Sequence, residues 1–143
     1  MKVSLPPVPQ SLEKLREALG EMLAELPDEE SRQIVLAVQE AAANYVQHAE
    51  RAEAGCALVV DVELDAARLT VRIPGFCRRG VERTISPRPL DQVRPGGLGT
   101  HFIREIMDRV EYRPGPQGFM TLVLIKTLRS GPGAPGRDRP NED

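Results

Sequence analysis

Three polar residues recur at four-residue intervals in the segment AVQEAAANYVQHAE: Glu40, Asn44 and His48. In an α-helix each step of four residues advances about 40° around the axis, so these side chains share one strip of about 80°. A carboxylate and an amide one turn apart suit a hydrated Mg²⁺ ion and an attacking hydroxyl group or water. The same spacing is also compatible with the solvated flank of an ordinary helix.

A run of glycines precedes a second amphipathic stretch, in the segment VRPGGLGTHFIREIMDRV. Gly96, Gly97 and Gly99 would let the backbone approach a phosphate closely, and the unpaired N–H groups at the start of the helix would face that anion. The lysine of a P-loop is absent, and no strand leads directly into these glycines as a dinucleotide-binding fold requires. Taken alone, the run could equally be a flexible hinge before a helix.

The hydrophobic pattern indicates which elements position these groups. Helical periodicity and short β-branched runs predict, in chain order, helices over 11–26 and 28–49, a hairpin of 57–64 and 68–73, a helix over 98–109, and a hairpin of 110–113 and 119–128. Residues 74–97 have no steady periodicity and predict a long loop. We therefore expect an α+β fold, a two-layer α/β sandwich with the helices on one face of a mainly antiparallel sheet.

The composition bounds the class of protein. A chain of 143 residues has room for one domain, which we place at 10–128, after an extended lead-in over 1–9 and before a disordered tail over 129–143. No apolar run is long enough to span a bilayer, and the first residues lack the pattern of a signal peptide. The two cysteines have no metal-ligand spacing. These features predict a cytoplasmic protein without membrane contact.

The charges are unevenly distributed although the net charge is −2. Residues 1–65 carry 13 acidic and 5 basic side chains, whereas residues 66–143 carry 8 acidic and 14 basic ones. The arginines of 72–94 could form a cationic lid over a triphosphate, a dock for an acidic partner, or simply a solvated loop. Aromatic residues make up only 3% of the chain, which argues against a nucleic-acid partner.

Together, the two motifs resemble those of the anti-sigma factor serine kinases, in the GHKL ATP-binding superfamily shared with histidine kinases and gyrase. The patterns AVxEAxxNxxxHA and GGLGxxxIxxxMDxVxY appear here as AVQEAAANYVQHA and GGLGTHFIREIMDRVEY. The closing strand GFMTLVLIKTL and the first helix also occur in the expected order, so the likeness covers about residues 10–128. The resemblance implies the Bergerat-type (GHKL) ATP-binding fold, with ATP and Mg²⁺ as cofactors.

The resemblance also implies a role for each matched position. Glu40 would orient or deprotonate the acceptor hydroxyl, and Asn44 would hold Mg²⁺ against the phosphates of ATP. His48 would pack near the nucleotide, Arg94 would neutralise the γ-phosphate, and residues 76–95 would be the lid. The further nucleotide contacts that it implies are Gly75, Gly96, Gly97, Leu98, Gly99 and Thr100.

One residue of the family pattern is missing. Family members usually carry Asp-x-Gly-x-x-Phe at the end of the second strand, and this Asp accepts a hydrogen from the adenine amino group. If Pro74-Gly75-Phe76 keeps the family register, Val71 stands at the Asp and Ile73 at the first glycine. An unpaired amino donor costs about 1–3 kcal/mol, a roughly tenfold to hundredfold loss of ATP affinity.

Two functions remain open from the sequence. The first is a bacterial anti-sigma regulatory factor with serine/threonine kinase activity, which phosphorylates a STAS-type anti-anti-sigma partner with Mg-ATP and sequesters a sigma factor. The second is a catalytically inactive GHKL module that acts only by protein–protein binding in a partner switch. Glu40 and Asn44 favour the first function, whereas Val71 and Ile73 favour the second. The resemblance also implies a homodimer and a role in transcription regulation.

Overall fold

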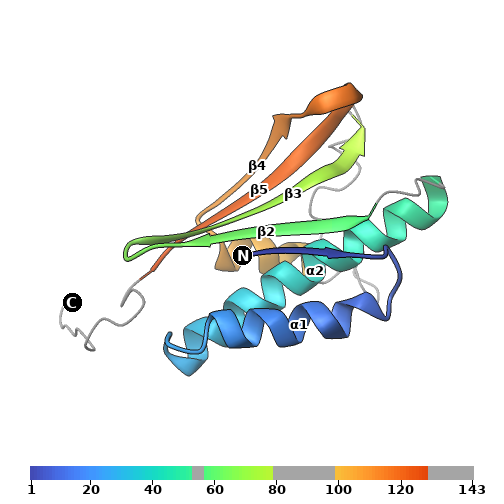
Figure 1. Ribbon diagram of the computed structural model, residues 1–143. Helices are drawn as coiled ribbons and strands as arrows, with labels where there is room; N and C mark the ends of the chain where they lie inside the picture. Colours follow the sequence, from blue (N-terminus) through green and yellow to red (C-terminus); the bar gives the residue numbers. More distant parts are fainter. Residues whose placement is uncertain (53–56, 79–98, 129–143) are drawn as a thin grey trace.

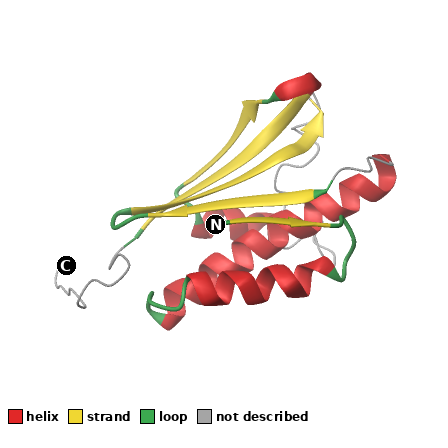
Figure 2. Ribbon diagram, viewed as in Figure 1, coloured by secondary structure: helices red, strands yellow, loops and turns green. Residues whose placement is uncertain are grey.

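The computed structural model describes residues 1–52, 57–78 and 99–128, and these form a sheet with helices on one side (Figure 1). The elements are β1 (Lys2–Leu5), α1 (Ser11–Met22), α2 (Asp28–Ala52), β2 (Leu58–Leu64), β3 (Arg68–Arg78), α3 (Gly99–Ile106), β4 (Arg109–Pro114), the 3-10 turn η3 (Pro116–Gly118) and β5 (Phe119–Thr127). Figure 2 shows the two layers, with α1, α2 and α3 below the strands in that view and η3 at the upper end of β4 and β5. The structure thus confirms the predicted α+β sandwich.

The sheet has five strands in the order β1-β2-β3-β5-β4, and every neighbouring pair is antiparallel. β3 and β5 form the centre, where Val71 pairs with Leu124. β4 continues this register on the far side of β5, with Val110 opposite the same Leu124. The two hairpins that the sequence predicted therefore exist, and their long strands β3 and β5 join them into one sheet.

The hydrophobic core lies between the helices and the sheet. α2 turns Ile34, Val38 and Tyr45 toward it at helical spacing, and β3 alternates buried and half-buried residues as a strand with one covered face does. Each fully buried aliphatic side chain contributes about 1.5–3 kcal/mol to folding. α2 also buries three alanines, Ala37, Ala41 and Ala42, whose small side chains permit close packing of its neighbours, among them α3.

Several boundaries differ from the expectation, among them the end of α3, which lies at Ile106 and not at residue 109 because Arg109 already pairs in β4. Residues 2–5 of the expected lead-in form β1, which pairs with β2 from Lys2–Asp61 to Leu5–Leu58. α1 ends at Met22, and the chain then turns so that Leu23 and Leu26 still reach the core. β3 continues to Arg78, beyond the expected end at Ile73, because an irregularity between Ile73 and Cys77 absorbs Pro74 and Gly75. The expected disordered tail lies outside the described residues.

Candidate nucleotide-binding site

α2 carries Glu40 and Asn44 at the boundary between core and solvent. Both residues are half-buried. Ala41, which follows Glu40, and Tyr45, which follows Asn44, are buried. The expected strip therefore lies beside the apolar face of the helix. A polar side chain there is held by the packing of its neighbours and still faces outward, as a group that must meet a ligand requires.

Burial changes the acid–base chemistry of Glu40. Loss of hydration raises the pKa of its carboxyl above the usual value for glutamate, because the charged form is the one that water stabilises. A carboxylate with a raised pKa is a stronger proton acceptor near neutral pH than an exposed one. The environment of Glu40 is thus suited to general-base chemistry.

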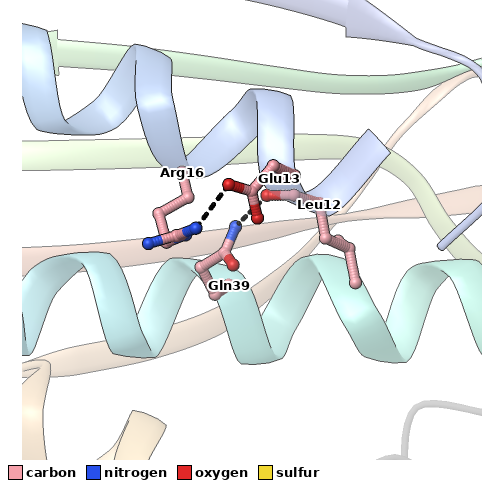
Figure 3. Close-up of polar contacts among 4 residues, drawn as sticks. All are labelled: Leu12, Glu13, Arg16 and Gln39. Atoms are coloured by element: carbon pink, nitrogen blue, oxygen red, sulfur yellow. Dashed lines mark hydrogen bonds and ion pairs between the residues drawn. The ribbon is translucent and has the colours of Figure 1, made fainter. Parts of the chain in front are cut away.

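A hydrogen bond from the residue before Glu40 joins α2 to α1. Gln39, the residue before Glu40, donates from Nε2 to the carbonyl oxygen of Leu12 at 2.8 Å (Figure 3). On the neighbouring turn of α1, Arg16 pairs with Glu13 at 2.5 Å, and this pair is exposed. The Gln39 bond ties the middle of α2 to the first turn of α1 and so fixes how this part of α2 lies against α1.

α3 begins at Gly99, the last glycine of the GGLG motif, and packs against α2. The first N–H groups of a helix have no partner within it, so they remain available to an anion. The structure therefore brings together the helix with Glu40 and Asn44 and the helix that the glycine run precedes. Other expected site groups lie outside the described residues, namely Arg94, Gly96, Gly97, Leu98, most of the 76–95 lid, and the side chains of His48 and Thr100.

The strand that would meet the adenine is apolar on its covered face. Val71 and Ile73 are both 0% exposed, and both belong to the main core. Gly75, two residues after Ile73, has a φ of 66°, which is a left-handed conformation that favours glycine. An Asp-x-Gly spacing counted back from this glycine ends at Ile73 and not at Val71. The backbone thus favours Ile73 as the position of the missing acidic residue, two residues after the expected position, Val71.

Three aromatic rings, from β3, α2 and β4, lie close together near the end of β3. The ring of Phe76 lies 6.3 Å from that of Tyr45 on α2 and 6.2 Å from that of Tyr112 on β4. Tyr45 also donates from its hydroxyl to the carbonyl oxygen of Ala57 at 3.0 Å. Because Tyr45 directly follows Asn44, these contacts hold the turn of α2 that carries the amide. No local pattern in the sequence predicts this cluster, because its members are far apart in the chain.

The described residues fit one end of Mg-ATP better than the other. Asn44 offers an amide oxygen, a ligand type that Mg²⁺ accepts, beside the carboxylate of Glu40. Within residues 1–52, 57–78 and 99–128 no three acidic, histidine or cysteine residues form a metal cluster, so an ion at Asn44 would depend on phosphate and water oxygens as well. At the adenine base, the side chains of Val71 and Ile73 offer no acceptor to the amino group.

The described part of the chain contains no helix long and apolar enough to cross a membrane.

Comparison with known proteins places this arrangement in a family. A model of the histidine kinase-like ATPase domain matches residues 5–126. Among solved structures, the chain is similar to one from the SiaB–SiaC complex of Pseudomonas aeruginosa, with a TM-score of 0.62, 15% sequence identity, and coverage of 90% of this chain and 89% of that chain. At that identity the likeness concerns the fold. No curated protein matches the sequence. The match over most of its length shows that this chain belongs to the histidine kinase-like ATPase domain family.

Proposed function

We propose that this protein is an anti-sigma regulatory factor that phosphorylates a serine or threonine on a STAS-type partner and, in the alternate state, binds a sigma factor. The observation that carries the proposal is the half-buried Glu40, whose pKa is raised, one helical turn from Asn44 and on a helix packed against α3. Family membership supports nucleotide binding. The fold likeness to a chain of a two-protein complex supports a protein partner.

Each group has a definite task in this proposal. Mg-ATP, when bound, supplies the phosphoryl group and much of the charge neutralisation that phosphoryl transfer needs. The carboxylate of Glu40 accepts the proton of the attacking hydroxyl and orients that oxygen. The amide oxygen of Asn44 would be one of the ligands of the bound Mg²⁺. The N–H groups at the start of α3 would stabilise phosphate oxygens, since the positive end of the helix dipole lies there.

Calorimetry and mass spectrometry test the kinase proposal directly. The protein is titrated with ATP with and without Mg²⁺ and then incubated with Mg-ATP and a STAS-domain protein from the same organism. We expect Mg²⁺-dependent binding and a phosphoserine or phosphothreonine on the STAS protein. Glu40→Gln should bind nucleotide as the parent does and transfer at least about a hundredfold more slowly, since a general base contributes that much or more. Undiminished transfer by this variant would reject the role of Glu40.

The second candidate is a partner-binding module without nucleotide chemistry, and the apolar face of β3 favours it. Two variants, Ile73→Asp and Val71→Asp, separate the candidates and also test the register. Both place a carboxyl in the core and should lower the melting temperature. If adenine binds at Ile73, Mg-ATP should restore the melting temperature of Ile73→Asp more than that of Val71→Asp, because a ligand stabilises the state it binds. No response to millimolar Mg-ATP in parent or variants would favour the binding module.

The remaining elements of the proposal come from the resemblance. They are the cytoplasm as the compartment, a homodimer as the assembly, and regulation of transcription as the output. Size-exclusion chromatography with light scattering would test the homodimer, with a mass of twice 15.8 kDa as the expected result.

A further inference from the structure

Three hydrogen bonds attach the C-terminal end of α3 to β5. Lys126 donates from Nζ to the carbonyl oxygen of Ile106, the last residue of α3, at 3.2 Å. Asp108 accepts from the backbone N–H of Thr127 through Oδ2, at 2.5 Å. The backbone N–H of Asp108 donates in turn to the carbonyl oxygen of Ile125 at 2.8 Å. We call Asp108 and Lys126, with these bonds, the α3 anchor.

The anchor meets a need that this helix cannot meet by itself. α3 has eight residues, fewer than the roughly 12–15 at which an isolated helix becomes even marginally stable in water. Its last carbonyl groups lack partners within the helix, and a cation at this end is favourable to the helix dipole. Ile103 and, directly after the helix, Met107 pack into the core and hold α3 against it. The anchor fixes the orientation of the α3 axis, because hydrogen bonds are directional and apolar packing is not.

Orientation matters because the two ends of α3 have different tasks. An eight-residue helix is about 12 Å long, so a tilt of about 10° about its anchored end moves the other end by about 2 Å. A misplacement of about 1 Å can cost about a hundredfold in rate at a reacting centre. The end that would move begins at Gly99 and lies on a helix packed against α2, which carries Asn44.

We propose that Asp108 and Lys126 are positioning residues that hold α3 in the orientation required for phosphate binding at its N-terminal end. Neither residue touches the nucleotide in this arrangement, and both act through the helix. The inference rests on the proposed nucleotide function and adds to it two residues remote from Glu40 and Asn44.

Matched variants of the full chain test the proposal. Lys126→Met and Asp108→Ala remove the two side-chain bonds, whereas Lys126→Arg keeps the donor and Asp108→Asn keeps an acceptor oxygen. Ser11→Ala is the control, since it removes a side-chain bond to the carbonyl oxygen of Pro6, 2.6 Å long, at the start of α1. It should lower stability without affecting α3.

Two readouts are compared: hydrogen exchange of the α3 amides without nucleotide, and the calorimetric Kd for Mg-ATP. In Lys126→Met and Asp108→Ala we expect exchange in α3 and the Kd each to rise roughly tenfold, as the loss of one charge-assisted hydrogen bond implies. The two conservative variants should remain within about threefold of the parent, and Ser11→Ala should leave both readouts unchanged.

The outcomes separate this inference from the proposed function. If the parent binds Mg-ATP and the anchor variants bind it as tightly as Ser11→Ala does, the positioning role is wrong and the proposed function stands. If α3 exchange is unchanged in both anchor variants, the anchor itself is wrong. If the parent binds no Mg-ATP, the proposed function fails, and the exchange data still decide whether the two residues hold α3.

Discussion

Glu40 lies on a flank of α2 where packing removes part of its hydration without placing it in the core. The neighbouring alanines and Tyr45 determine this position, because they bury the adjacent face of the helix. The raised pKa follows from that geometry and needs no charged neighbour to explain it. A residue type and its spacing were enough to single out Glu40 and Asn44. Their half-buried state could be expected from the width of the apolar stripe.

The raised pKa predicts how stability depends on pH. The folded protein binds this proton more readily than the unfolded chain, so the contribution of Glu40 is favourable in acid and is lost as the pH rises through the folded-state pKa. Glu40→Gln carries no charge at any pH, and it should therefore melt at a higher temperature than the parent at pH 7. The difference should vanish by about pH 4, near the ordinary glutamate pKa.

Thermal denaturation followed by circular dichroism at a series of pH values measures this difference. Glu17→Gln, at an exposed position in the middle of α1 and away from both ends of the helix, is the control and should follow the parent throughout. A Glu40→Gln variant that is less stable than the parent at pH 7 would show that the carboxylate has a stabilising partner and would contradict the prediction.

The sequence predicted the helices and strands that a local residue pattern determines. It did not predict those that form only through pairing with a distant strand. α2 and both hairpins follow from periodicity over many residues. β1 was missed because four alternating residues before three prolines carry little signal, and only pairing with β2 makes them a strand. The end of β3 was placed too early because Pro74 and Gly75 are usual strand breakers, yet an irregularity in the β3–β5 pairing accommodates them. The α3 anchor joins the C-terminal end of α3 to a strand about 20 residues further along the chain, so no local sequence pattern could predict it.

Two glycines in different elements predict opposite effects of the same substitution. Gly75 has a φ of 66°, and an alanine there is strained by about 1–2 kcal/mol although its side chain would meet nothing within 4 Å. Gly20 lies in α1 with open space around it, so Gly20→Ala should stabilise the protein by about 0.5–1 kcal/mol. Urea denaturation of both variants measures the free energies of unfolding. An unchanged or raised free energy of unfolding for Gly75→Ala would contradict the strain at Gly75, and a lowered one for Gly20→Ala would contradict the prediction for α1.

Charged side chains form ion pairs on the face of the sheet that the helices leave open. Arg72 pairs with Glu63 at 3.2 Å, and Glu111 pairs with Arg109 at 2.7 Å and with Arg113 at 2.8 Å. Val123 and Ile125 alternate with the core residues of β5 and are nevertheless buried, outside the main core. The pairing places them beside Arg72, Glu111 and Arg109, whose aliphatic stems can cover them.

These ion pairs predict a salt-dependent contribution to stability. Glu111→Gln leaves two neighbouring arginines without their carboxylate and should lower the free energy of unfolding by up to about 1 kcal/mol at low ionic strength. In about 1 M salt the Debye length falls to about 3 Å, and the difference from the parent should largely disappear. Urea denaturation at both ionic strengths measures it. A loss that is equal at the two salt concentrations would show that packing, and not charge, accounts for the effect.

The place of β1 at one edge of the sheet has a consequence for the order of folding. All of α1 and α2 lies between β1 and β2 in the chain, so their pairing closes a long loop, whereas β2 and β3 are joined by a short turn. Closing a long loop is slow. An edge strand of four residues forms few contacts, and it gains these only after its partner strand is in place. We therefore expect β1 to dock last and to open first under mild denaturation. That opening would expose the edge of β2 to pairing with other chains, so the earliest step toward aggregation would leave the helices of the candidate site intact.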